Sequence, residues 1–214
     1  METLSLPALP RDFYVGSPDA VAPALLGKLL IRRLGRQILA GRIVEVEAYF
    51  GTGDPAAHSF AGRTARNSVL FGPPGHAYVY LIYGMHYCLN VSCEPDGLAG
   101  CVLIRALEPV AGLEAMALLR TLAPGADDRL STSGPGRLCQ AMGITRAELD
   151  GADLTALHSP LYIAVDDSPA RAIMVTPRIG ISKAADLPLR FSVAGNRFVS
   201  RAAKPLQNRR RAGS

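Results

Sequence analysis

The stretch of sequence that decides the fold is Tyr78-Val-Tyr-Leu-Ile-Tyr-Gly-Met-His-Tyr-Cys-Leu-Asn90. Apolar and β-favouring residues fill both halves, and Gly84 lies where the chain must reverse, so we expect a β-hairpin that turns at residues 83–85. Hairpin turns usually contain small polar residues, but here Tyr83 precedes the glycine. A ring at the tip of a hairpin can serve as a wedge, and in a basic protein the natural target is a stack of bases.

The rest of the chain alternates short apolar segments with Gly- and Pro-rich connections. One helix is expected to begin at Pro18, with Ser17 as N-cap, and to be ended by Gly27. Another is expected at residues 109–122, and residues 133–142 should open into a short helix. Residues 50–75 form a long loop. Further strands are expected at residues 28–34, 37–49, 101–107, 161–165, 173–176 and 189–193. This pattern predicts an α+β fold: a single mixed domain with a curved, largely antiparallel β-sheet, short helices and long ordered loops.

Length and composition are consistent with one domain over residues 1–214, with an extended arm at 1–10 and a frayed basic tail at 204–214. The net charge of +5 suits a polyanionic partner. The four cysteines lack metal-site spacing, which favours reduced thiols in the cytoplasm. The N-terminus does not resemble a signal peptide, and no apolar run is long enough for a membrane span.

Two glutamates in the strand 37–49 are candidate general bases. Alternation places Val44, Val46 and Ala48 on one face of that strand. It places Glu45, Glu47 and Tyr49 on the other face, where a carboxylate beside a glycine-rich loop can activate water. The strand alone does not choose between the glutamates, and both could simply be solvated.

The hairpin and the adjoining loop offer groups for binding a base. A three-residue turn puts Tyr80 and Asn90 on one face, where a ring and an amide can stack on a base and read its edge. His58 lies in the long loop, without a partner that the sequence identifies. Arg105 interrupts an apolar strand and must pair either with a glutamate or with a ligand.

Two segments could contact phosphates. In the first, Ser133, Gly134 and Arg137 bring a hydroxyl, backbone N–H groups and a positive charge to the start of a helix. In the second, Arg63 and Arg66 lie three residues apart in the long loop. Neither segment is specific as a motif.

Six blocks resemble the alkyladenine (3-methyladenine) DNA glycosylase family in order and spacing, and the resemblance runs from about residue 11 to 200. They are Arg42-Ile-Val-Glu-Val-Glu-Ala-Tyr49, Ala56-Ala-His-Ser59, Tyr78-Val-Tyr-Leu-Ile-Tyr-Gly-Met85, Cys88-Leu-Asn90, Leu103-Ile-Arg-Ala-Leu-Glu-Pro109 and Gly134-Pro-Gly-Arg-Leu-Cys-Gln140. The resemblance implies a single mixed α/β domain that uses no essential metal or other cofactor.

The resemblance also implies a role for each matching residue. Glu47 would be the general base, with Arg105 near the catalytic water, and Tyr83 would enter the gap that an extruded nucleotide leaves in DNA. Asn90 would crowd the amino group of guanine. The remaining walls of the base pocket would be Tyr49, His58 and Tyr80.

The implied activity is that of a monofunctional glycosylase in base excision repair. We expect the protein to be a monomer and to be cytoplasmic, and nucleoid-associated if it is bacterial. Its partner would be double-stranded DNA that contains damaged purines of the 3-methyladenine, 7-methylguanine, hypoxanthine and ethenoadenine class. It would hydrolyse the N-glycosidic bond of the flipped nucleotide and leave an abasic site. The alternatives are a non-catalytic nucleic-acid-binding module with the same basic surface and aromatic hairpin, and a small-molecule hydrolase or transferase.

Overall fold

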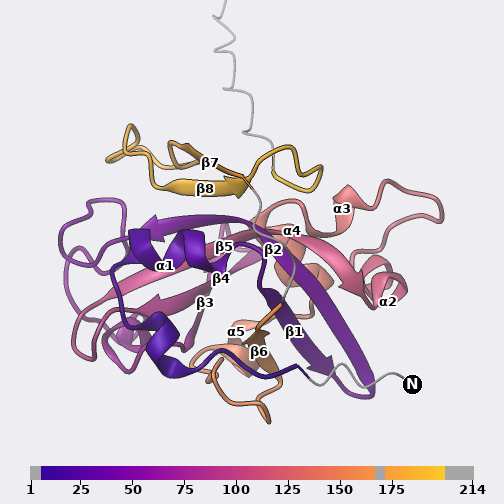
Figure 1. The fold of residues 1–214 in the computed structure, drawn as a ribbon, viewed down its shortest axis with the longest axis horizontal. Helices are drawn as coiled ribbons and strands as arrows, with labels where there is room; N and C mark the ends of the chain where they lie inside the picture. Colours follow the sequence, from indigo (N-terminus) through magenta and orange to yellow (C-terminus); the bar gives the residue numbers. More distant parts are fainter. Residues whose placement is uncertain (1–5, 167–171, 201–214) are drawn as a thin grey trace, which may run out of the picture.

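A curved antiparallel sheet of eight strands frames the protein in the computed structural model, which describes residues 6–166 and 172–200 (Figure 1). The strands, in chain order, are β1 (Leu29–Leu34), β2 (Gln37–Tyr49), β3 (Ala77–Ile82), β4 (His86–Cys93), β5 (Gly100–Ala111), β6 (Leu161–Ala164), β7 (Ile173–Thr176) and β8 (Arg190–Val193). This arrangement confirms the predicted single α+β domain and its antiparallel sheet.

The long strand β2 organises the sheet. The main order is β3-β4-β5-β2-β1-β6, with β8 beside β2 and β7 beside β8. β5 pairs along most of β2, whereas β1 pairs with its first half, from Gln37 to Arg42, and β8 with Glu45–Glu47. The second half of β2 therefore has a hydrogen-bonded neighbour on both sides, which fixes the backbone that carries both glutamates.

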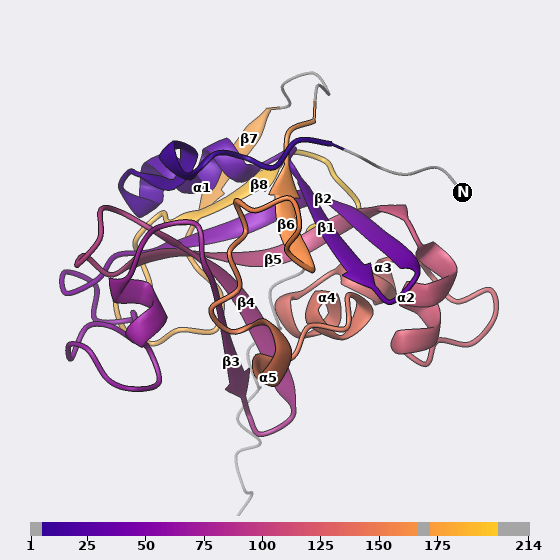
Figure 2. The same ribbon diagram turned by 90° about the horizontal axis from the view of Figure 1, so that it is seen from below.

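Short helices cover the sheet. They are the 3₁₀ helices η1 (Arg11–Tyr14) and η2 (Ser68–Phe71) and the α-helices α1 (Pro18–Leu25), α2 (Leu113–Leu119), α3 (Arg129–Thr132), α4 (Pro135–Ala141) and α5 (Arg146–Leu149). Figure 2 shows α2, α3 and α4 gathered at one end of the sheet and α1 at the other. α4 packs on β4 and β5, α5 on β3, and α1 on β2. None of the helices in the described part of the chain has the length and apolar character needed to cross a membrane.

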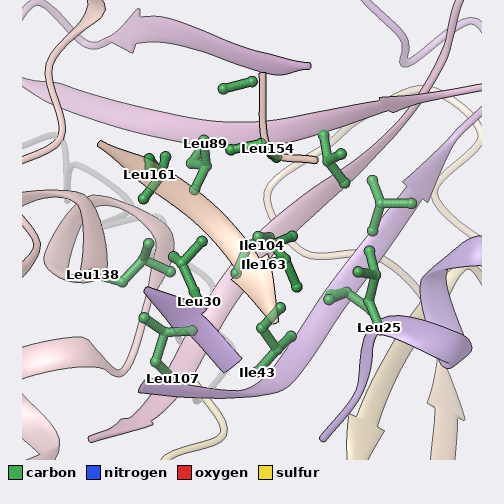
Figure 3. Packing of buried hydrophobic residues seen from close by; sticks show 14 of the residues in the cluster. Leu25, Leu30, Ile43, Leu89, Ile104, Leu107, Leu138, Leu154, Leu161 and Ile163 are labelled. Atoms are coloured by element: carbon green, nitrogen blue, oxygen red, sulfur yellow. The ribbon is translucent and has the colours of Figure 1, made fainter. Parts of the chain in front are cut away.

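The main core lies between the helices and one face of the sheet. Leu30, Ile43, Leu89, Ile104 and Leu138 interlock there and are shielded from solvent (Figure 3). Alternation along β3, β4 and the first half of β5 sends side chains such as Val79, Leu89 and Val102 into this core and the side chains between them to the opposite face. That opposite face carries the candidate site.

A β-bulge in β2 corrects one prediction. Ile43 pairs with Leu107 and the next paired residue is Glu45, opposite Ala106, so Val44 is skipped. Val44 was expected beside Val46, but it packs in a separate small cluster with Ala106. The bulge thus turns Val44 onto the face that carries the glutamates.

A second correction concerns the segment predicted as a helix over 109–122. β5 continues through Pro109 to Ala111, because Pro109 pairs with Gly41 at another irregularity of the ladder. The helix α2 therefore begins only at Leu113. In the predicted N-terminal arm, Ala8 forms an isolated bridge to Ala164 and η1 follows, while the predicted tail at 204–214 lies outside the described residues.

Candidate active site

A cavity of about 500 Å³ opens on the face of the sheet opposite the main core. Its walls come from β2–β5, from the long loop 50–75 and from residues 179–181. Tyr78 pairs with Asn90 and Tyr80 with Cys88, so the hairpin presents two rings, an amide and a thiol side by side. This confirms the face that the three-residue turn predicts.

An aromatic corner forms where the loop meets the hairpin. The His58 ring lies edge-on to Tyr80 with centroids 4.4 Å apart, and its Nδ1 is 3.1 Å from the Tyr78 hydroxyl. Burial raises the pKa of Tyr78 to about 12 and also raises that of Tyr80. Burial and the nearby Arg66 lower the pKa of His58 below its usual value. The corner therefore stays uncharged at neutral pH.

Asn90 is buried at the back of the cavity with its amide fixed. Its Nδ2 donates to the Tyr78 carbonyl at 3.2 Å, and the Cys101 thiol lies 3.9 Å from its Oδ1. Because both ends of the amide have partners, the group presents a defined edge rather than a rotating one.

Glu47 lies directly behind the cavity wall and is 0% exposed. Its Oε2 accepts a hydrogen bond from the Tyr49 hydroxyl at 2.8 Å, and its Oε1 accepts one from the Ile179 N–H at 2.8 Å. Arg105 Nη1 is 3.1 Å from the same Oε1. The sequence left open a solvated glutamate, and that alternative is wrong, because Glu47 is fully buried. Its three partners line the cavity and surround the carboxylate.

Glu45 has a different environment. It accepts bonds from Arg105 Nε and Arg190 Nε, at 2.8 and 2.7 Å, and from the backbone and side chain of Ser200. Burial alone would raise the pKa of Glu45, but the two arginines outweigh it and lower the pKa. The oxygens of Glu45 are thus taken up by protein partners, and this carboxylate holds Arg105 in place, whereas Glu47 is the carboxylate beside the cavity.

Arg105 joins the two glutamates. Arg105 has no paired residue on β2, because it lies opposite the bulge. From this position its guanidinium contacts both carboxylates. The ion pair that the sequence offered as one outcome is therefore confirmed. Arg105 also lines the cavity, and its contact with a ligand there stays a prediction.

Tyr83 projects from the hairpin tip with 81% of its surface exposed. Met85 N–H bonds to the Ile82 carbonyl at 3.2 Å, and Tyr83 and Gly84 between them have φ of +52° and +71°. Positive φ at both central residues is the turn that favours Asn-Gly, so the backbone holds a tyrosine where it is strained.

Of the residues proposed to contact phosphates, Arg66 lines this cavity and three others line an adjoining one. Arg66 is exposed and its guanidinium is 5.9 Å from the centre of the Tyr80 ring, while Arg63 is exposed nearby in the loop. Gly134 and Arg137 line an adjoining cavity of about 470 Å³, which shares Arg105 with the first. Ser133 lines it too, although its hydroxyl already donates to the Phe198 carbonyl at 2.7 Å.

A sequence model of one family matches almost the whole described chain. The model is that of methylpurine-DNA glycosylase (MPG), and it covers residues 12–197. The chain belongs to the methylpurine-DNA glycosylase family.

Individual relatives agree with this match. A protein from Koribacter versatilis (strain Ellin345), named "Putative 3-methyladenine DNA glycosylase", is 60% identical over 195 residues, which cover 91% of this chain and 94% of its own. Proteins with the same name from Burkholderia lata and Methanoculleus marisnigri are 53% and 52% identical, over 90% of this chain in both cases. They are matched over 90% and 98% of their own lengths.

Membership of the methylpurine-DNA glycosylase family makes the chain a hydrolase of N-glycosyl bonds that binds DNA. The matched range contains every candidate site residue named from the sequence. Sequence reasoning missed Ile179, whose backbone N–H holds Glu47, and its neighbour Arg178. Every residue except proline has a backbone N–H, so the type of residue at position 179 does not reveal this role. No motif in the sequence pointed to residues 178–179 either.

Proposed function

We propose that the protein is a monofunctional glycosylase that flips damaged purines out of duplex DNA and hydrolyses the bond between base and sugar. The observation that supports this most is the combination of Glu47, held behind a cavity walled by rings, with Tyr83 exposed on the same hairpin as those rings. The proposed substrates are 3-methyladenine, 7-methylguanine, hypoxanthine and ethenoadenine. We also propose that a monomer does this work.

The hairpin would capture the nucleotide. Extruding a base costs a few kcal/mol, least when the base is damaged or mispaired, and Tyr83 would offset part of that cost by filling the gap. The rings of His58 and Tyr80 are in contact, so the extruded purine would enter between Tyr49 on one side and these two rings on the other. A positively charged alkylated base would gain about 0.5–2 kcal/mol from each well-placed ring. Asn90 would crowd the 2-amino group of guanine-type bases.

The chemistry would then fall to Glu47 and Arg105. A carboxylate offers about four acceptor sites, and three donors occupy those of Glu47, so a site remains for a water. Glu47 would take a proton from this water as its oxygen attacks C1′, and the bonding pair would leave with the base. Admission of the water requires a small displacement of the Tyr49 or Arg105 side chain, which would accompany entry of the base.

The strand itself would stay intact. Cleavage of DNA at the abasic site by a covalent route needs an amine nucleophile. Among the described residues that line the cavity there is no lysine. The exposed Arg63, Arg66 and Arg137 would contact the phosphates. Ser133 and Gly134 would do so only by exchanging internal partners, since the Ser133 hydroxyl donates to the Phe198 carbonyl and the Gly134 N–H to the Thr132 carbonyl.

A base-release assay tests the proposal. Duplexes with one lesion each are incubated with the protein, and free base, abasic sites and strand breaks are measured. We expect release of at least one of the four bases, with breaks only after alkali treatment. Tight duplex binding without release of any of the four would instead identify a non-catalytic nucleic-acid-binding module. No dependence on Tyr83→Ala would favour a small-molecule enzyme.

A further inference from the structure

Arg178 is a buried arginine that the proposed chemistry does not use. Its Nη1 and Nη2 lie 2.5 and 3.0 Å from the two carboxylate oxygens of Asp54, and both side chains are buried. Nη1 also donates to the Ala48 carbonyl at 3.0 Å. The guanidinium lies over the ring of Tyr49, 4.5 Å from its centre. Tyr49 lines the cavity and Arg178 does not, so Arg178 supports that ring from behind.

These contacts join three segments that are far apart in the sequence. Asp54 belongs to the loop that carries His58, and it also accepts a hydrogen bond from the Ala56 N–H at 3.0 Å. Ala48 and Tyr49 end β2. Arg178 is followed by Ile179, whose N–H donates to Glu47. The Arg178 guanidinium thus connects three parts of the cavity wall. They are the loop that carries His58, the ring of Tyr49, and the segment whose Ile179 N–H donates to Glu47.

Stability is a poor explanation for such a pair. Removing two charges from water costs about as much as their attraction returns, and apolar pairs of similar volume often serve a fold equally well. Moreover, Arg178 Nε is buried without a partner among the described residues, which is a further cost. A planar guanidinium orients its partners, which an apolar side chain does not do. Its N–H groups align with a carboxylate and its flat face aligns with an aromatic ring.

We propose that Arg178, held by Asp54, is a positioning residue for base release: it sets the orientation of Tyr49 and of the 177–181 segment around Glu47. The inference rests on the proposed function. Lysine at position 178 keeps the charge but loses the fork and the flat face. It should therefore misplace the reacting groups while leaving duplex capture by the exposed hairpin untouched.

Arg32 provides a matched control. It is a buried arginine on β1, it pairs with Glu148 at 2.5 Å, and its Nε also lacks a partner among the described residues. Arg178→Lys and Arg32→Lys are each compared with the parent protein in thermal unfolding, in duplex affinity and in single-turnover base release.

We expect both variants to unfold at lower temperature and to bind duplex DNA as the parent does. Only Arg178→Lys should release base more slowly, by about 10- to 100-fold, the range in which displacement of reacting groups by about 1 Å falls. Asp54→Asn should act in the same direction, and combining it with Arg178→Lys should add little.

An unchanged release rate in Arg178→Lys, or an equal loss in both lysine variants, would overturn the inference while leaving the proposed function standing. A parent protein that released none of the four bases would refute the proposed function and the inference together.

Discussion

The strained tip of the hairpin allows a test in which stability and function change in opposite directions. Tyr83 has φ of +52°. A non-glycine residue in the left-handed region costs about 1–2 kcal/mol, and asparagine tolerates that region better than most residues. The Tyr83 ring is 81% exposed, so removing it forfeits little packing. We therefore expect Tyr83→Asn to stabilise the fold by about 0.5–1 kcal/mol.

For a chain of this size, about 1 kcal/mol changes the midpoint of thermal unfolding by about 2–4 °C. Thermal unfolding of Tyr83→Asn should therefore show a midpoint about 1–4 °C above that of the parent. Affinity for a duplex with a single hypoxanthine should fall, by about 5- to 150-fold if the ring stacks on bases, since such stacking is worth about 1–3 kcal/mol.

Tyr83→Phe is the control for this experiment. It keeps the ring and the strained backbone, so it should match the parent in both the unfolding midpoint and the duplex affinity. The reasoning fails if Tyr83→Asn is less stable than the parent, or if it binds the duplex equally well.

Three further predictions concern groups around the cavity. Glu45→Gln leaves Arg105 and Arg190 with an uncharged partner, so chemical denaturation should show a loss of about 3–5 kcal/mol, and an unchanged midpoint would contradict the anchoring role. Asn90→Ala should raise release of 7-methylguanine relative to hypoxanthine, because only the former carries a 2-amino group; an unaltered ratio in competition assays would remove Asn90 from specificity. The pKa of His58 is lowered, so the residue gains its charge only as the pH falls below its ordinary value of about 6.5. Release of cationic 7-methylguanine should then decline relative to release of neutral hypoxanthine, because a protonated His58 repels a cationic base. If the ratio of the two release rates changes with pH in the same way in His58→Gln, protonation of His58 is not the cause.

Local patterns predicted the hairpin and its face well. An odd number of turn residues and strict alternation determine which side chains share a face, so Tyr80 and Asn90 could be placed together before any coordinates. The resemblance of six short blocks then pointed to the family that the comparisons confirm. The roles of the individual site residues stay predictions, which the experiments above address.

Features that depend on distant partners could not be predicted in the same way. The bulge at Val44 arises from pairing between β2 and β5, and the sequence of β2 alone contains no mark of it. Pro109 is typical of the first turn of a helix, but its pairing with Gly41 in the sheet overrides this local preference for a helix. Arg178 finds Asp54 across 124 residues, and neither residue stands out locally.

The burial of Glu47 has the same origin. Alternation placed its side chain on the correct face of β2, but only the fold brings Ile179 and Arg105 over that face. The strand pattern therefore offered Glu45 and Glu47 as candidates without showing that partners enclose Glu47.

Single-turnover base release by Glu47→Gln tests the central claim most directly. Glutamine keeps the shape of the side chain and removes the base, and general-base catalysis typically contributes about 10²- to 10⁴-fold. We expect Glu47→Gln to bind a hypoxanthine-containing duplex as tightly as the parent does while releasing the base at least about 100-fold more slowly. Release at a rate close to that of the parent would show that Glu47 is not the group that activates water.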